Sequence, residues 1–473
     1  MNASDSLRPY RPMLWLVATA VFMQMLDTTI VNTALPAMAR DLGQSPLRMQ
    51  AVVFAYALTV AMLIPASGWL SDRFGTRRVF FIAVLVFTAG SLACALAPSF
   101  NWLVAGRVVQ GIGGAMLLPV GRLAVLRTVP RRDFLAAMTF VTVPGLIGPL
   151  IGPTLGGWLV DVASWPWIFL INLPLGLAGA VATLRWMPDL RVAVAGFDLV
   201  GYLLLAFAML AISLSLDALS GQGSNRGGSL VLLIGGLVAL ASYWLHAARS
   251  PAPLFPLSLF RVRTYGVGVI GNLFARLGSG GMPYLIPLLL QVALGYPAAH
   301  AGMMMIPIAA AAMFSKHIVV PLVRRFGYRQ VLVVNTVLTG LVMASFALIE
   351  PGRPLALHVA HFALFGAVNS VQFTAMNTLT LRDLGGEQAS AGNSLLSMVM
   401  MLAVSLGVAA AGGLLAAFSG AAGGDGDAAP VLTAFRWTFL CVGTVTAISS
   451  VIFAQIGDTR RIPDQVVEAS ETG

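Results

Sequence analysis

The residue with the clearest capacity for chemistry is Asp27, an acid within the first apolar segment, which begins near Met13. At ~1.5 Å of rise per residue, a membrane helix starting there carries Asp27 to a depth of ~20 Å, beyond the midplane but within the span. An acid at that depth is costly, so its presence indicates a function. Burial favours the neutral acid and a nearby arginine favours the carboxylate. Asp27 is therefore a candidate for exchanging a proton.

Two arginines in apolar segments are the charged counterparts of Asp27. Arg107 lies in the outer third of the segment 101–124, and Arg276 lies near the middle of the segment 265–291. A permanent Asp27–Arg107 ion pair that never titrates is the structural alternative to proton exchange, and both interpretations stay open. We find no acid at mid-membrane depth in the second part of the chain. Its buried charge is therefore positive and favours an anionic ligand.

The composition places these residues in lipid. Hydrophobic residues make up 58% of the 473 residues and charged residues 10%, against about 25% charge in a soluble domain. The net charge of +10 lies in short arginine clusters between apolar runs, so no nucleic-acid partner is expected. Cys94 and Cys441 are predicted to be small core residues. No metal cluster, cofactor motif or catalytic constellation is recognised, so we predict no enzyme, no cofactor and no metal site.

Fourteen segments are long and apolar enough to cross a bilayer, which needs about 20 residues each. The first is expected to be retained as a helix and not cleaved as a signal peptide. The spans are 13–35, 49–70, 79–98, 101–124, 136–160, 166–186, 198–217, 229–247, 265–291, 299–320, 330–349, 355–379, 393–418 and 431–455.

Arginines mark alternate loops, and arginine-rich loops face the cytoplasm in membrane proteins. This bias predicts that both termini are cytoplasmic. The arginine-rich side holds Arg8, Arg11, Arg73, Arg77, Arg78, Arg127, Arg131, Arg132, Arg191, Arg249, Arg261, Arg263, Arg324, Arg325, Arg329, Arg382, Arg460 and Arg461. The opposite loops hold Arg40, Arg48, Arg226 and Arg353, with Arg436 just inside the last span.

An internal repeat divides the chain. The stretch that begins at Leu42-Gly43 aligns without a gap with the stretch that begins at Leu294-Gly295, and each contains a basic turn with Phe-Gly between two apolar helices. The repeat predicts an all-α membrane fold of two related six-helix bundles, with a substrate site between them. The predicted domains are residues 1–190, a pair of extra helices in 191–262, and residues 263–473. The repeat also pairs Arg276 with Gln24, on the cavity-facing part of the first helix.

Several motifs together resemble the fourteen-helix drug:proton antiporter branch of the major facilitator superfamily, over nearly the whole chain. They are Leu26–Pro36 in the first helix, Gly68–Arg78 between the second and third, Arg107–Gly114 in the fourth, Gly145–Gly157 in the fifth, and Trp165–Pro174. The resemblance implies a multi-pass protein of the bacterial inner membrane that acts as a monomer, as most members of the family do.

The resemblance also assigns roles to residues. It implies proton coupling by Asp27 and Arg107, and a substrate cavity that includes Gln24, Asn32, Gln110 and Arg276. The turn implies a conformational latch of Gly68, Asp72, Arg73, Gly75, Arg77 and Arg78, in which Asp72 pairs with an arginine or caps the next helix. The fifth helix implies an antiporter motif of Gly145, Gly148, Pro149, Gly152, Pro153, Gly156 and Gly157, where small residues allow close packing.

The function expected from these features is export of small, sometimes amphipathic compounds in exchange for protons, by alternating access within the lipid bilayer. Because the buried charge of the second half is Arg276, export of organic anions such as carboxylate metabolites is the alternative. A membrane sensor without transport is a distant third hypothesis, since such a protein would usually carry a larger soluble domain.

Overall fold

The computed structural model describes residues 7–130, 133–192, 196–220, 226–350, 352, 354–384, 386–421 and 428–457. Arg131, Arg132, Arg353, Arg460 and Arg461 of the charge pattern lie outside them. Every regular element in this part of the chain is helical, as predicted. Thirteen of its helical segments are long and apolar enough to cross a membrane. Together with the 29-residue helix α6, they are consistent with the fourteen spans expected.

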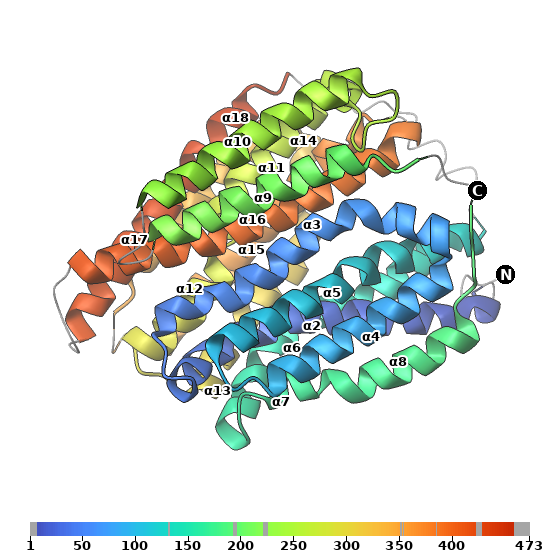
Figure 1. Ribbon diagram of the computed structural model, residues 1–473. Coiled ribbons are helices and arrows are strands. Elements are labelled where there is room, and N and C mark those ends of the chain that lie inside the picture. Colours follow the sequence, from blue (N-terminus) through green and yellow to red (C-terminus); the bar gives the residue numbers. More distant parts are fainter. Residues whose placement is uncertain are drawn as a thin grey trace.

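The first bundle contains α2 to α8, drawn from blue to teal in Figure 1. Its helices pack mainly as the pairs α2–α6, α4–α5 and α3–α5. Their bounds are α2 (Arg11–Asp41), α3 (Gln50–Phe74), α4 (Thr76–Ala95), α5 (Phe100–Thr128), α6 (Phe134–Val162), α7 (Trp167–Leu170) and α8 (Asn172–Trp186).

The second bundle contains α11 to α18, drawn from yellow-green to red in Figure 1. Its main helix pairs are α14–α15, α14–α17 and α11–α16. The bounds are α11 (Arg263–Ser279), α12 (Met282–Leu288), α13 (Ala298–Met303), α14 (Ile306–Ala344), α15 (Leu355–Arg382), α16 (Gly386–Ala421), α17 (Ala428–Ile448) and α18 (Ser450–Ala454).

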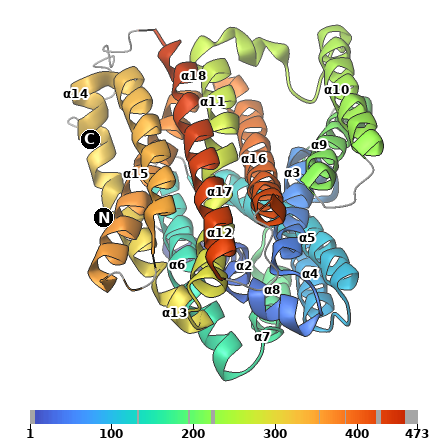
Figure 2. The ribbon, with the colours of Figure 1, turned by 90° about the vertical axis from the view of Figure 1, so that its left-hand side faces the viewer.

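The two extra helices, α9 (Leu199–Ser220) and α10 (Arg226–Arg249), form a hairpin at one edge of the molecule (Figure 2). Helix α9 packs against α16 of the second bundle and α3 of the first, and α10 packs mainly against α9. The hairpin therefore touches both bundles without entering either one. The domain boundaries at 190/191 and 262/263 stay a prediction.

Matching backbone breaks support the repeat. Gly43 and Gly295 have φ of +62° and +70°, and Gly75 and Gly327 have φ of +92° and +78°. Each pair has the spacing at which the two sequence stretches align. Only glycine adopts this left-handed region readily, so each glycine ends one helix and redirects the chain into the next. The two basic turns of the sequence are thus the same structural turn used twice.

Two predicted spans are more irregular than the sequence indicated. The segment 265–291 breaks at Gly280 and Gly281, and a π-helical turn, Leu289–Ala293, follows α12. The break has a packing cause, because a Cβ added at Gly281 would lie 2.6 Å from the Cβ of Ala411 in α16. The segment 166–186 likewise divides into α7 and α8.

The bundles are joined at the end opposite the arginine-rich turns. Gln291 Nε2 donates to Thr33 O at 2.8 Å, and Tyr284 Oη donates to Leu47 O at 3.3 Å. The backbone nitrogen of Ala299 donates to Asp161 Oδ2 at 2.9 Å. Each of these contacts pairs one bundle with the other, so the arginine-poor end of the molecule is closed.

Candidate functional site

The centre of the first bundle holds a buried ion pair. Arg107 Nη1 on α5 lies 2.6 Å from Asp27 Oδ2 on α2, and the two side chains are 1% and 0% exposed. Arg107 Nε donates to Val52 O at 3.1 Å, and its guanidinium lies 4.3 Å from the ring centroid of Tyr56. The acid and the arginine that the sequence singled out are therefore in direct, buried contact.

Neutral side chains complete the hydrogen bonding of the pair. Gln110 Nε2 donates to Asp27 Oδ1 and to Ser91 Oγ, each at 2.7 Å, while Gln110 Oε1 accepts from Arg107 at 2.6 Å. Asn172 Nδ2 lies 3.4 Å from Asp27 Oδ1 and 3.2 Å from Ser91 Oγ. A buried charge is tolerated when it is paired and hydrogen-bonded in this way. Four helices, α2, α4, α5 and α8, supply the network.

Glycines allow these helices to approach closely. A Cβ added at Gly90 of α4 would run into the backbone of Gln110, and one at Gly113 of α5 into the backbone of Phe87. A Cβ at Gly114 would lie 2.6 Å from the hydroxyl of Tyr56. The glycines of the 107–114 motif therefore bring α5 against α3 and α4, which carries Arg107 and Gln110 to the acid.

The sequence missed three members of this site. Asn172 lies in the Trp165–Pro174 motif, and its position as a polar residue at the start of an apolar helix was the available signal. Ser91 and Tyr56 are ordinary residues of their helices and carried no signal. Gln110, predicted to line the substrate cavity, is a member of the ion-pair network. Its assignment to the cavity stays a prediction.

Two further cavity candidates lie on α2. Gln24 and Asn32 are 4% and 5% exposed, and the side-chain oxygen of each is buried without a hydrogen-bond partner. The Tyr56 hydroxyl, on the neighbouring α3, is also buried and lies against the Gln24 side chain. Unpaired buried acceptors are costly, which makes these positions candidates for contact with a ligand or water.

Arg276 on α11 is a partly buried cation without an acid among the described residues beside it. Its guanidinium lies 4.4 Å from the ring centroid of Phe373 on α15, and its Nε lies 3.3 Å from Asn272 Oδ1. Its Nη2 atom is buried and unpaired, and no carboxylate in the described chain lies within ion-pair distance. The second bundle therefore holds an unneutralised positive charge where the first holds a neutral pair.

The turn between α3 and α4 contains the predicted latch residues. Asp72 Oδ1 pairs with Arg127 Nη1 of α5 at 2.6 Å, an arginine outside the predicted set. Helix α4 begins after Gly75 with no side-chain cap, so Asp72 does not serve as its cap here. Gly68 is open to the addition of a Cβ, whereas one at Gly75 would overlap the carboxylate of Asp189.

The segment after α8 covers the turn. Arg77 Nε donates to Met187 O, and the Thr76 hydroxyl donates to Pro188 O, both at 2.6 Å. Thr76 N also donates to Leu190 O at 3.2 Å. Arg73 and Arg78 lie on the outside of the turn. The turn is therefore tied to α5 and to the end of α8, all within the first bundle.

We expect Arg127→Gln to weaken this turn modestly. The Asp72–Arg127 pair is partly exposed, at 20% and 27%, so solvent screens it. The loss of an exposed pair costs about 0–1 kcal/mol, and we expect a fall in Tm of no more than a few degrees. Thermal unfolding of the purified protein measures this. Arg185→Gln, on the exposed end of α8, is the control. A large destabilisation would mean that the pair does more than join the turn to α5.

The predicted antiporter helix, α6, packs through its glycines. A Cβ added at Gly148 would lie 2.8 Å from the backbone nitrogen of Leu26, and one at Gly156 would lie 2.6 Å from Ile30 O. Gly145 and Gly152 face α2 in the same way, whereas Gly157 meets Ala298 of the other bundle. Pro149 and Pro153 lie within this helix. The first four glycines therefore allow α6 to pack closely on α2, beside the buried acid. Gly157, near the end of α6, contacts the second bundle.

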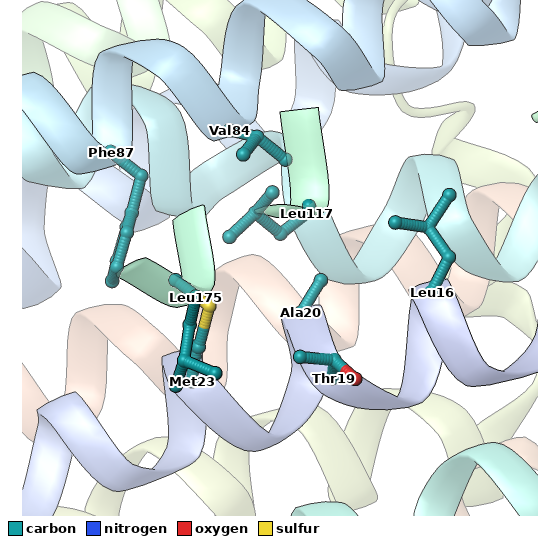
Figure 3. A pocket seen from close by; sticks show the side chains of 9 residues that line it. Leu16, Thr19, Ala20, Met23, Val84, Phe87, Leu117 and Leu175 are labelled. Carbon is teal, nitrogen blue, oxygen red and sulfur yellow. The ribbon is translucent and has the colours of Figure 1, made fainter. Parts of the chain in front are cut away.

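A small apolar cavity lies near the site, between α2, α4, α5 and α8 (Figure 3). Its volume is about 10 Å³, and Met23, Phe87 and Leu117 are among its lining residues. Ligand pockets usually measure about 300–1,000 Å³, so this void belongs to the packing of the bundle.

Two bundles of membrane helices with matching turns, closed on each other at one end and holding a buried acid–arginine network, define a membrane transporter. The chain belongs to the Major Facilitator Superfamily, whose sequence model matches residues 17–408. This family is one of transporters, so the chain is a transporter and not an enzyme. It is a multi-pass membrane protein that handles a small molecule.

Relatives and solved structures agree with this assignment. The chain is 51% identical to a Serratia proteamaculans protein provisionally named multidrug resistance protein MdtD, over 94% of this chain and 93% of that protein. A Cronobacter sakazakii protein of the same name is 52% identical over 96% of each chain. A bacterial homologue of the lysosomal transporter Spinster, solved facing inward, has a TM-score of 0.68 at 16% identity, with 94% of this chain and 97% of that one covered. A D-xylose–proton symporter has a TM-score of 0.66 at 14% identity, covering 95% and 98%.

Proposed function

We propose that this chain is a proton-coupled secondary transporter that exports small compounds, amphipathic ones among them, by alternating access. The provisional multidrug names of relatives that are about half identical over nearly the full length support the export of varied compounds. The observation that carries the coupling is the buried Asp27–Arg107–Gln110 network.

In this mechanism, protonation of Asp27 breaks its ion pair. The neutral acid can no longer balance Arg107, so the network must rearrange, and Gln110, Ser91 and Asn172 are the groups that can take new partners. Because α6 packs on α2 beside Asp27 and reaches the second bundle through Gly157, a shift of α2 bears on the contact between the bundles. The bound proton and the export substrate then favour opposite states.

The sidedness follows from the arginine pattern. We place the arginine-rich end and both termini in the cytoplasm of a bacterial inner membrane, and we take the protein as a monomer. The closed, arginine-poor end then faces outward, so the path to the outside is shut in this state. Substrate enters from the cytoplasm in this state, and opening of the outer end releases it.

The available driving force is sufficient for export. A membrane potential of about 100 mV is worth about 2.3 kcal/mol per charge. One pH unit adds about 1.4 kcal/mol. One proton exchanged for one neutral molecule then supports a gradient of about two to three decades, whereas a monovalent cation exchanged one for one draws only on the pH difference.

A second candidate function is export of organic anions, and the observation that favours it is Arg276. The side chain is aligned by Asn272 and Phe373, and no acid of the described residues pairs with it. An uncompensated buried cation is costly unless a ligand supplies the counter-charge, and a carboxylate can bind a guanidinium through two hydrogen bonds. A lipophilic cation would be repelled by the same group.

Substrate class can be decided with one substitution. In proteoliposomes with an imposed pH gradient, we compare tetraphenylphosphonium and ethidium with succinate and benzoate. The anion function predicts that Arg276→Gln lowers carboxylate transport at least tenfold, since a charge-assisted hydrogen bond is lost (about 1.5–3 kcal/mol). Cation transport that survives Arg276→Gln, with no carboxylate transport by the wild type, would instead support multidrug export. Transport indifferent to the pH gradient would contradict proton coupling for either class.

A further inference from the structure

The hairpin of extra helices carries a polar pocket that transport does not explain. An open cavity of about 490 Å³ lies at the arginine-rich end of α10. It is lined by Ser242, Leu245, His246, Arg249, Ser250 and Pro251. Two serine hydroxyls, an imidazole and a guanidinium therefore converge on one recess, and no acidic side chain is among its lining residues.

Asp198, just before α9, holds the imidazole in place. Its carboxylate lies 2.7 Å from His246 Nε2 and accepts from the backbone nitrogens of Gly201 and Leu254, both at 2.9 Å. Burial alone would raise the pKa of Asp198, but the hydrogen bonds from Gly201, Leu254 and His246 outweigh it and lower this pKa. The acid stays ionised and fully engaged. His246 is thereby oriented, with its Nε2–H donated to Asp198.

Arg249 supplies the free charge. Its side chain is exposed and makes no ion pair in the part of the chain that the structure describes. Asp198 is occupied with three donors, so it does not cancel the positive charge of Arg249. A guanidinium beside two hydroxyl donors is an arrangement that can bind a phosphate group.

The pocket lies at the end of an exposed, apolar helix face. In the span Gly227–Arg249, 22% of the 18-residue apolar stretch is buried, which is the lowest share among the thirteen candidate spans. Trp244 and Leu245, in the last turns of α10, are 51% and 59% exposed. Tryptophan at this depth is typical of the boundary between acyl chains and headgroups. An apolar helix face therefore runs directly into a basic, hydroxyl-bearing recess.

We propose that this pocket binds the phosphate of an anionic phospholipid, with Arg249, His246 and the serine hydroxyls on the headgroup and the acyl chains along the exposed face of α10. Asp198 is a positioning residue that fixes His246 and ties α9 to the segment before α11. Because α10 packs on α9, and α9 contacts both α3 and α16, a lipid held here is linked through α9 to both bundles. The extra helices thus acquire a role as a lipid-anchored strap beside the transport interface.

The test measures lipid affinity of the full-length protein in detergent micelles, by native mass spectrometry, with phosphatidylglycerol and phosphatidylcholine as probes. We expect the wild type to bind phosphatidylglycerol more tightly than phosphatidylcholine. In Arg249→Gln the ratio of the two affinities should fall about tenfold, because one charge-assisted hydrogen bond to the phosphate is lost. Arg185→Gln is the matched control. Arg185 is also exposed, lies in the last turn of α8 as Arg249 does in α10, and is next to the exposed Trp186. It should keep the wild-type preference.

Three results would overturn the proposal. An unchanged preference in Arg249→Gln would show that the pocket does not select the lipid, and an equal loss in Arg185→Gln would reduce the effect to general surface charge. Glycerol phosphate that competes as strongly as phosphatidylglycerol would assign the pocket to a soluble phosphate. Asp198→Asn, which leaves Arg249 intact, should weaken binding less than Arg249→Gln does, and thermal unfolding of each variant confirms that it is folded.

Discussion

Asp27→Asn should abolish accumulation of substrate against a pH gradient. With one proton exchanged per neutral molecule, a gradient of about one pH unit supports about tenfold accumulation in the wild type. The amide cannot exchange a proton, so the variant should reach only equal concentrations on both sides. It also leaves Arg107 buried without its counter-charge, which costs about 3–5 kcal/mol when one partner of a buried pair is removed. A lowered Tm should accompany the lost coupling.

Flux and stability must be measured together, because an unfolded variant also fails to transport. Proteoliposomes loaded with each probe compound give the accumulation ratio, and substrate exchange without a pH gradient reports whether the variant can still change conformation. Glu350→Gln is the matched control, since Glu350 pairs with Arg436 at an exposed site outside the bundle core. Accumulation that persists in Asp27→Asn would leave Asp27 and Arg107 as a structural pair and assign coupling elsewhere.

Gly157→Ala should prevent full closure of the arginine-poor end. A Cβ at this position would overlap the backbone carbonyl of Ala298 in the opposite bundle, where no flexible side chain can give way. Overpacking of a close contact costs about 1–3 kcal/mol, which shifts a two-state equilibrium by about 5- to 150-fold. We expect the variant to favour the state opened at this end, with transport slowed because closure is part of every cycle.

Distances between spin labels at Ser45 and His300, exposed positions on the two bundles at this end, measure the shift, with Cys94 and Cys441 first replaced by alanine. Gly179→Ala is the control, because its added Cβ would meet only Val84, at an ordinary contact of 3.7 Å. The label distance should lengthen in Gly157→Ala and stay unchanged in Gly179→Ala. Equal distances in both variants would mean that Gly157 does not control closure.

Much of the architecture was predictable because the signals are local. Apolar segment length identified the membrane helices, and the aligned turns at Gly75 and Gly327 identified the duplication, which the shared backbone conformation of these glycines supports. The breaks at Gly280 and Ile171 were not predicted, since hydropathy carries no trace of the contacts that a helix makes with other parts of the fold.

The site was predictable only in part. A buried acid and a buried arginine stand out in apolar helices, so Asp27 and Arg107 could be named as partners. Ser91 and Tyr56 could not, because a serine or tyrosine is common in any helix, and only the rotation of α3 and α4 about their axes aims these two inward. The same holds for Gln110, which could face either the cavity or the ion pair.

The sequence by itself determined that this chain is a duplicated membrane transporter with an acid and arginines buried in its spans, because lipid imposes length, apolarity and charge placement on each helix separately. Tertiary structure alone decided that Asp72 pairs with Arg127, that the glycines of α6 divide between α2 and α13, and that Arg276 pairs with no acid in the described part of the chain. Those outcomes depend on how helices distant in sequence are rotated and spaced against one another. Close packing of side chains sets that geometry, and no single segment contains it.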